Sequence, residues 1–136
     1  MSINIKSEKE IEIMREAGHI LAKILDELTK YVSPGLSTLD IDRRCAQLIK
    51  SYDCIPSFLN YNGFPASLCV SINQEVVHGI PNKDRILQNG DIVSLDCGVI
   101  YQGFQSDAAR TVGIGEITKE ARQLIDVTQQ SFYEEF

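Results

Sequence analysis

The chain has 136 residues, of which 43% are apolar, and its 19 acidic and 13 basic side chains give a formal net charge of −6. This length and apolar fraction suit one globular domain, or a large part of one, with a real core. The acidic balance argues against a nucleic-acid surface, whose usual footprint is a basic patch. No apolar run is long enough to span a bilayer.

The first part of the chain predicts two helices. Ser7 and Glu10 form a capping-box pattern at the start of an amphipathic stretch over 7–32. Ser33-Pro34-Gly35 should end this helix, because proline and glycine cannot continue it. Apolar residues at helical spacing then predict a second helix over 38–52.

The middle of the chain predicts a loop followed by strands. Residues 56–65 are rich in glycine, asparagine and aromatic residues, which favours an ordered loop over a solvated linker. Strands are predicted at 67–72, 91–100 and 104–112, the last two around a tight turn. Thr118 should cap a final helix. This order of helices, strands and a helix indicates an α+β domain.

Two carboxylates face each other in the predicted hairpin. With a two-residue loop at 101–102, Asp96 lies opposite Asp107; a four-residue loop keeps this register and a three-residue loop shifts it by one. Opposed like charges on a partly buried sheet are unfavourable unless a cation lies between them. A hard or borderline divalent ion would remove the repulsion. The alternatives are that one or both carboxylates point to solvent, or that Arg110 pairs with one of them.

His78 is the other reactive candidate, in a turn that contains glycine and proline. Its imidazole could donate a hydrogen bond to a substrate or to a developing oxyanion. The alternative is a surface or capping histidine with no chemical role.

The four cysteines predict a reducing compartment. They form neither a CxxC pair nor a zinc-finger spacing. The amino-terminal residues are polar and charged, unlike a signal peptide. We therefore expect reduced, mostly buried cysteines and a cytoplasmic location.

Several segments resemble one known family. The run 89–98 (NGDIVSLDCG), followed by Gly103-Phe104, Asp107 and Arg110-Thr111, resembles the pita-bread metallopeptidases. The runs 77–81 (VHGIP) and 61–65 (YNGFP) are similar to type I methionine aminopeptidases in particular. The similarity covers essentially the whole chain. It implies half of a pita-bread (creatinase/aminopeptidase) fold, in which helices cover an antiparallel sheet.

The resemblance also implies roles for individual residues. Asp96 and Asp107 would be metal ligands in a site that holds two divalent ions when complete, such as Co, Mn, Fe or Zn. His78 would contact the substrate near the scissile amide. Three side chains would line the pocket for the methionine side chain: Tyr61, Phe64 and Cys69. Asn73 would lie near a loop that binds a monovalent cation.

The implied activity is hydrolytic removal of the initiator methionine from proteins whose next residue is small. Residues 1–136 would be the N-terminal half of this catalytic domain; the C-terminal half, which supplies further ligands, is absent. The expected partners are the N-terminal peptides of nascent proteins, rather than nucleic acid or membrane. Negligible activity of the half-chain alone is one expectation. A homodimer through the exposed half-cleft and a non-catalytic module that binds peptides or proteins are the alternatives.

Overall fold

The computed structural model describes residues 3–135 as an α+β arrangement, as predicted. Helices and strands follow the predicted order, with a short 3-10 helix in the aromatic loop. The elements in chain order are α1 (Glu8–Tyr31), α2 (Thr38–Ser51), β1 (Ile55–Pro56), η1 (Tyr61–Gly63), β2 (Leu68–Ile72), β3 (Ile92–Tyr101), β4 (Phe104–Gly113) and α3 (Lys119–Glu134).

Both long helices begin at reciprocal caps. Ser7 Oγ accepts the Glu10 N–H, and the Glu10 carboxylate accepts the Ser7 N–H at 2.7 Å, which confirms the predicted capping box. Ser37 and Asp40 form the same arrangement at the start of α2. Each cap satisfies backbone N–H groups that have no partner inside the helix. The sequence therefore fixes where both helices begin.

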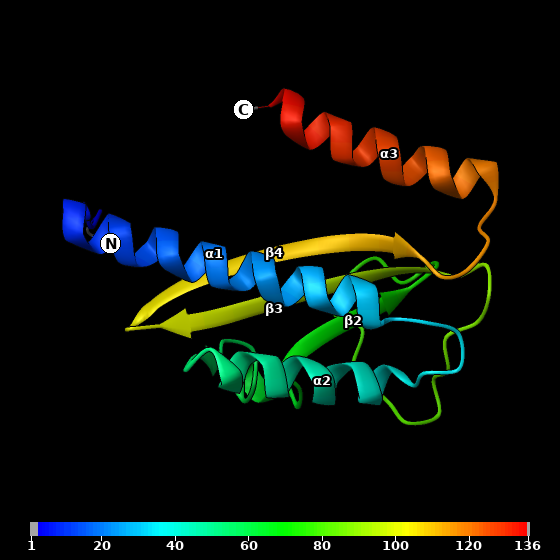
Figure 1. Ribbon diagram of the computed structural model, residues 1–136, viewed down its shortest axis with the longest axis horizontal. Helices are drawn as coiled ribbons and strands as arrows, with labels where there is room; N and C mark the ends of the chain where they lie inside the picture. The colour runs from blue at the N-terminus through cyan, green and yellow to red at the C-terminus, as the bar shows by residue number, and fades with distance from the viewer. Residues whose placement is uncertain (1–2, 136) are drawn as a thin grey trace.

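The sheet is antiparallel and β3 lies at its centre. β4 pairs with β3 along its whole length (Figure 1). Both β1 and β2 pair with the opposite edge of β3. Successive residues of a strand point to opposite faces. The residues of β3 that face the helices are fully buried: Val93, Leu95, Cys97 and Val99.

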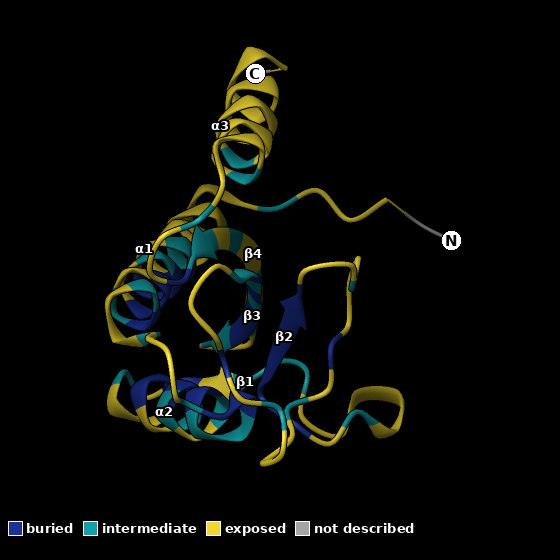
Figure 2. Ribbon diagram, turned by 90° about the vertical axis from the view of Figure 1, so that its right-hand side faces the viewer, coloured by how far each residue is buried: buried dark blue, intermediate teal, exposed yellow. Residues whose placement is uncertain are grey.

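Two helices cover one face of the sheet. α1 packs against β3 and β4, whereas α2 packs against β1 and β2. Loops, rather than a helix, lie against the other side of β2 (Figure 2). We call the face of the sheet that the two helices do not cover the open face. On β3 and β4 this face contains Ser94, Asp96, Gly98, Asp107 and Thr111.

The predicted register of the hairpin is wrong by two residues. The turn consists of Gln102 and Gly103, both with positive φ (48° and 86°), so Tyr101 pairs with Phe104. Two-residue turns of this kind match the twist of the strands, and glycine adopts positive φ without steric cost. An even shift keeps every side chain on its predicted face, because the side-chain period of a strand is two.

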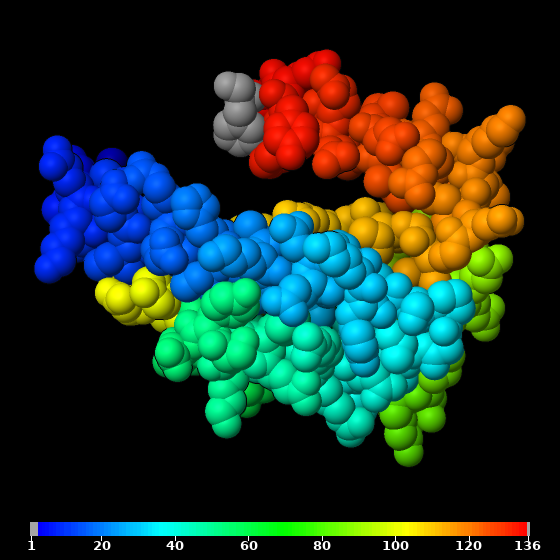
Figure 3. All heavy atoms as spheres, in the orientation of Figure 1, coloured from blue at the N-terminus to red at the C-terminus, as the bar shows by residue number. Residues whose placement is uncertain are grey.

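The last helix makes few contacts with the rest of the chain. Thr118 caps α3 by accepting the Ala121 N–H, as predicted, but no described residue of α3 is buried. Figure 3 shows α3 standing away from α1 and β4, joined to the body near its first turn. None of the helices within residues 3–135 combines the length and apolar character needed to cross a membrane.

All four cysteines are free and buried, as expected from their spacing. Two of them meet in the core between α2 and β3, where Cys45 Sγ and Cys97 Sγ lie 3.5 Å apart. They behave there as small apolar side chains with a weak S–H donor.

Candidate metal and peptide site

The open face brings the two predicted metal ligands together. Asp96 pairs with Ala109 and Asp107 pairs with Gly98, so the two aspartates are diagonal rather than direct neighbours. Their side chains are close enough to interact, and the charge of Asp107 raises the pKa of Asp96. Among the described residues, neither carboxylate takes part in an ion pair with lysine or arginine.

The electrostatics of Asp96 reflect this crowding. Burial, followed by the charge and the hydrogen bond of Asp107, raises the pKa of Asp96 to about 6. The nearby His78 acts in the opposite direction and lowers it. A carboxylate in this setting is stabilised by sharing a proton or by a neighbouring cation. The two carboxylates therefore favour a bound proton or cation between them.

Arg110 does not supply that charge. It lies opposite Leu95, on the face of the sheet that the helices cover, and forms an ion pair with Asp26 of α1. The alternative in which Arg110 pairs with Asp96 or Asp107 is therefore wrong. Asp107 is exposed, whereas Asp96 is partly buried and does not simply point to solvent.

The glycine that follows His78 lets this loop approach β2 closely. A Cβ on Gly79 would lie 2.0 Å from the carbonyl oxygen of Val70, so only glycine can approach β2 this closely. His78 itself is exposed and has a φ of +59°, a left-handed conformation that is uncommon for a residue other than glycine. The charge of His78 lowers the pKa of Asp96.

An aromatic pair lies next to the carboxylates. Phe64 packs edge-to-face against Phe58, with ring centroids 6.4 Å apart and an interplanar angle of 86°. A Cβ on Gly98 would come within 2.8 Å of Phe58 Cε1, so the Phe58 ring lies over this glycine. Gly98 is the direct partner of Asp107. Tyr61, at 70% exposure, stands further out on the same loop.

Phe58 lies against Gly98 on the open face and was not among the pocket residues predicted from the sequence. Its position depends on Gly98, a contact distant in the sequence for which no local pattern exists. A glycine in the middle of a predicted strand was the available signal, because such glycines mark close approach by another group.

Cys69 lies directly opposite Asp96 on β2 and is 4% exposed. Burial, followed by the charge of Asp96, raises the pKa of the Cys69 thiol to about 11. The thiol is therefore protonated at neutral pH, whereas a nucleophile or a metal ligand needs the thiolate. Cys69 can serve as a soft, neutral wall of a pocket.

Asn73 joins the ends of β2 and β3. Its side-chain amide donates to Asp91 Oδ1 at 2.9 Å and accepts the Ile92 N–H at 3.0 Å. Its backbone, with φ of +54°, also donates to the Ile92 carbonyl. The predicted role of Asn73 near a monovalent cation stays a prediction.

The residues present fit a divalent cation only in part. Within residues 3–135, no group of three or more His, Cys, Asp or Glu side chains could hold a metal ion. Asp96 and Asp107 offer the oxygen donors that hard and borderline divalent ions prefer. The described residues thus bring together two carboxylate donors, which are too few to close a metal site.

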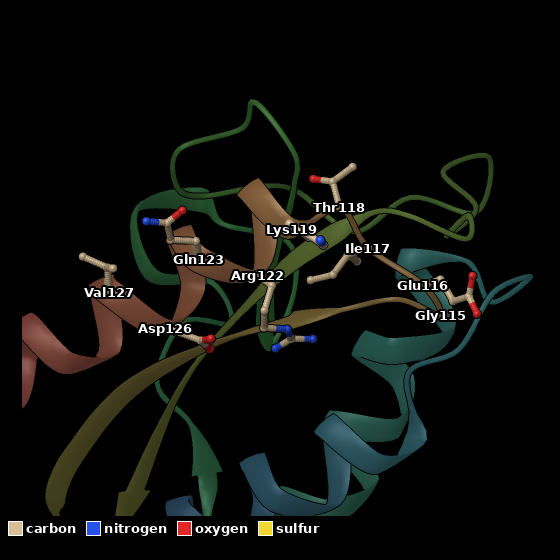
Figure 4. A pocket seen from close by; sticks show the side chains of 9 residues that line it. All are labelled: Gly115, Glu116, Ile117, Thr118, Lys119, Arg122, Gln123, Asp126 and Val127. Carbon is tan, nitrogen blue, oxygen red and sulfur yellow. The ribbon is translucent and has the colours of Figure 1, made fainter.

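A separate hollow of about 620 Å³ lies at the root of α3. Its lining comes from the turn after β4 and the first turns of α3 (Figure 4): Gly115, Glu116, Ile117, Thr118, Lys119, Arg122, Gln123, Asp126 and Val127. None of the predicted site residues is among them. The lining of this hollow contains no histidine and no aromatic side chain.

Comparison with known protein families identifies the class of this chain. The chain matches metallopeptidase family M24 over residues 12–134 and belongs to this family. Divalent metal use, the predicted chemistry, follows from that membership.

Named relatives refine this assignment. The chain is 56% identical over 131 residues to a methionine aminopeptidase of Clostridium acetobutylicum, covering 96% of this chain and 52% of that protein. It is 45% identical over 128 residues to methionine aminopeptidase 1 of Bacillus subtilis, covering 94% and 51%. The crystal structure of methionine aminopeptidase from Rickettsia prowazekii matches with a TM-score of 0.92 at 43% identity, covering 95% and 52%.

These matches confirm the resemblance to the methionine aminopeptidases and the half pita-bread fold. They also show that the chain spans about half the length of the curated relatives it matches.

Proposed function

We propose that this chain is the metal-binding half of a methionine aminopeptidase, which removes the initiator methionine from proteins whose next residue is small. One observation carries the proposal. The open face brings together a crowded carboxylate pair, an exposed histidine and an aromatic lining. Relatives named methionine aminopeptidase, at 45% and 56% identity, support it.

Asp96 and Asp107 would hold divalent ions, with Co, Mn, Fe and Zn as candidates and two ions in a complete site. When bound, such ions activate water and stabilise the charge that develops on a carbonyl oxygen. Since carboxylates bind metal in the deprotonated form, and the pKa of Asp96 is raised to about 6, metal binding should weaken as the pH falls below that value.

His78 would hold the peptide at the scissile amide. Its exposed imidazole can donate a hydrogen bond to the substrate carbonyl oxygen, and the bond would strengthen as negative charge develops there. The preference for a methionine side chain would come from the neighbouring aromatic pair, Phe58 and Phe64, with Tyr61 and the neutral thiol of Cys69. A polarizable thioether makes favourable contacts with the edges of aromatic rings.

The activity is tested by hydrolysis of the peptide Met-Ala-Ser in the presence of Co²⁺ or Mn²⁺. We expect negligible turnover by the chain alone, because the described residues supply too few ligands. Addition of a polypeptide corresponding to the remaining half of the Clostridium acetobutylicum relative should restore turnover. Asp96→Asn should abolish the restored activity, whereas the matched control Asp84→Asn, in an exposed turn, should not change it.

Two outcomes would contradict this proposal. Robust turnover by the chain alone would remove the need for a second half. Peptide binding that needs no metal and survives Asp96→Ala would instead indicate a non-catalytic binding module.

We also propose that two copies of the chain can associate through the open face when no second half is present. The absence of a covering helix over the described part of this face, and the lack of any buried residue in α3, support this proposal. Two copies would bring two carboxylate pairs to one interface, where a metal ion would neutralise them. A monomer by light scattering at micromolar concentration, with Mn²⁺ present, would overturn the homodimer.

A further inference from the structure

One hydroxyl on the open face holds the residue next to His78. Ser71 Oγ accepts the Gly79 N–H at 3.1 Å in a buried hydrogen bond, and Ser71 is 4% exposed. The Gly79 carbonyl in turn accepts the Val70 N–H at 2.9 Å. Both backbone hydrogen-bonding groups of Gly79 are therefore tied to β2.

His78 depends on support of this kind. Its left-handed backbone is a sparsely populated conformation, which persists only where surrounding contacts hold it. Its imidazole is exposed and forms no hydrogen bond within residues 3–135, so the side chain does not hold the backbone. The orientation of His78 must then come from its neighbour Gly79.

The other anchors of this loop act further from His78. Thr38 Oγ1 accepts the Asn82 N–H at 2.8 Å and donates to the Asn82 carbonyl at 3.0 Å. Glu75 accepts the Ile72 N–H and pairs with Arg85. These contacts fix the two ends of the loop, whereas the Ser71 contact fixes its centre.

We propose that Ser71 is a positioning residue: its hydroxyl sets the backbone at 78–79 and thereby aims His78 at the carboxylate pair. The inference rests on the proposed function of His78 in peptide hydrolysis. Ser94 provides a matched control, because it pairs directly with Ser71 on the same face. Its hydroxyl bonds to Thr111 Oγ1 at 2.7 Å and does not reach the loop.

The geometry is tested by NMR on the ¹⁵N-labelled chain, without any need for activity. In Ser71→Ala, the Gly79 amide should exchange with solvent about tenfold faster, the effect of losing one hydrogen bond. His78 should also lose the strong intraresidue HN–Hα contact that marks a positive φ. Ser94→Ala should leave both signals unchanged. Unchanged signals in Ser71→Ala, or equal losses in Ser94→Ala, would overturn the proposal.

A second variant guards against misfolding. If Ser71→Ala loses the core signals of Leu95, Ser71→Cys keeps the side-chain volume with a weaker acceptor. The same faster exchange of the Gly79 amide is then expected with the core signals intact, and its absence would count against the role of the hydroxyl.

The effect on function is measured in the peptidase assay in which a second polypeptide restores turnover. Ser71→Ala should lower kcat about tenfold or more with little change in KM, because misplacement of a catalytic group costs rate rather than ground-state binding. In the background of His78→Ala it should cost nothing further, which a purely structural role would not predict. If no variant turns over, the proposed function fails, and the NMR result still decides the role of Ser71.

Discussion

The two faces of β3 are formed by alternate residues of one strand, yet they differ in burial and polarity. Towards the helices, Val93, Leu95 and Val99 are fully buried in the core. Towards the open face, Asp96 and Gly98 are polar or small and meet loops and the other carboxylate. The difference shows that adjacent residues of one strand can belong to the hydrophobic core and to the candidate site.

The largest expected effect is on the covered face. Leu95→Ala should lower the free energy of unfolding by about 3 kcal/mol, because it removes packed methyl groups and leaves a cavity. Urea unfolding followed by circular dichroism measures this loss. Ser94→Ala, one residue away on the other face, should cost less than about 1 kcal/mol. Similar losses of unfolding free energy in both variants would contradict the proposed difference between the two faces of the strand.

A second prediction concerns the connection between α2 and β2. Asp42 Oδ1 accepts the Ser67 N–H at 2.8 Å and the Leu68 N–H at 3.0 Å. Asp42→Ala leaves two backbone donors without their acceptor and should cost about 2 kcal/mol in urea unfolding. Asp42→Asn keeps a side-chain oxygen and should recover part of the loss. If Asn were no better than Ala, the hydrogen bonds would not be the cause.

The pH dependence of stability should reflect the carboxylate pair on the open face. Because the pKa of Asp96 is raised to about 6, the folded chain binds an extra proton between the ordinary carboxylate pKa and that value. The stability contribution of Asp96 therefore falls as pH rises from 4 to 7, by about 1–2 kcal/mol. Urea unfolding in EDTA should show this as a difference between the wild-type chain and Asp96→Asn. A difference that is flat with pH would contradict the crowding of the carboxylates.

The smallest effect is expected at the rim of the covered face. The Arg110–Asp26 ion pair joins β4 to α1, but both side chains are substantially exposed, at 40% and 55%. Asp26→Asn should therefore cost only about 0.5 kcal/mol, and high salt should remove the difference. Chemical unfolding at low and high ionic strength measures it. A loss as large as that of Leu95→Ala would mean that surface charge, rather than packing, holds α1 on the sheet.

Elements with local signals could be predicted from the sequence. The Ser7–Glu10 box, the helical spacing of apolar residues and the Thr118 cap place the helices within one or two residues of their observed ends. The predicted hairpin register is wrong because it places the two-residue turn at 101–102, one residue before its observed position at Gln102 and Gly103. The positive φ of Gly103 belongs to the second position of a two-residue turn, and that assignment gives the observed pairing.

The candidate site could be predicted only in part. The motifs predict Asp96, Asp107 and His78; the structure puts the two aspartates on the same face of the sheet, and the chemical roles of all three residues stay predictions. Phe58 and Ser71 were missed because their roles depend on contacts with Gly98 and Gly79, which only the folded loops create. Side chains that shape a site through such contacts carry no local sequence pattern.

The two-residue turn between β3 and β4 also has a consequence for the order of folding. Hairpins close in microseconds, whereas contacts between distant segments form later because loop closure costs entropy. The β3–β4 hairpin should thus form early, and it brings Asp96 close to Asp107 before α1 docks. Their repulsion would then already be felt in the folding transition state. Asp107→Asn should accelerate refolding in stopped-flow experiments at neutral pH in EDTA, while the unfolding rate should change little.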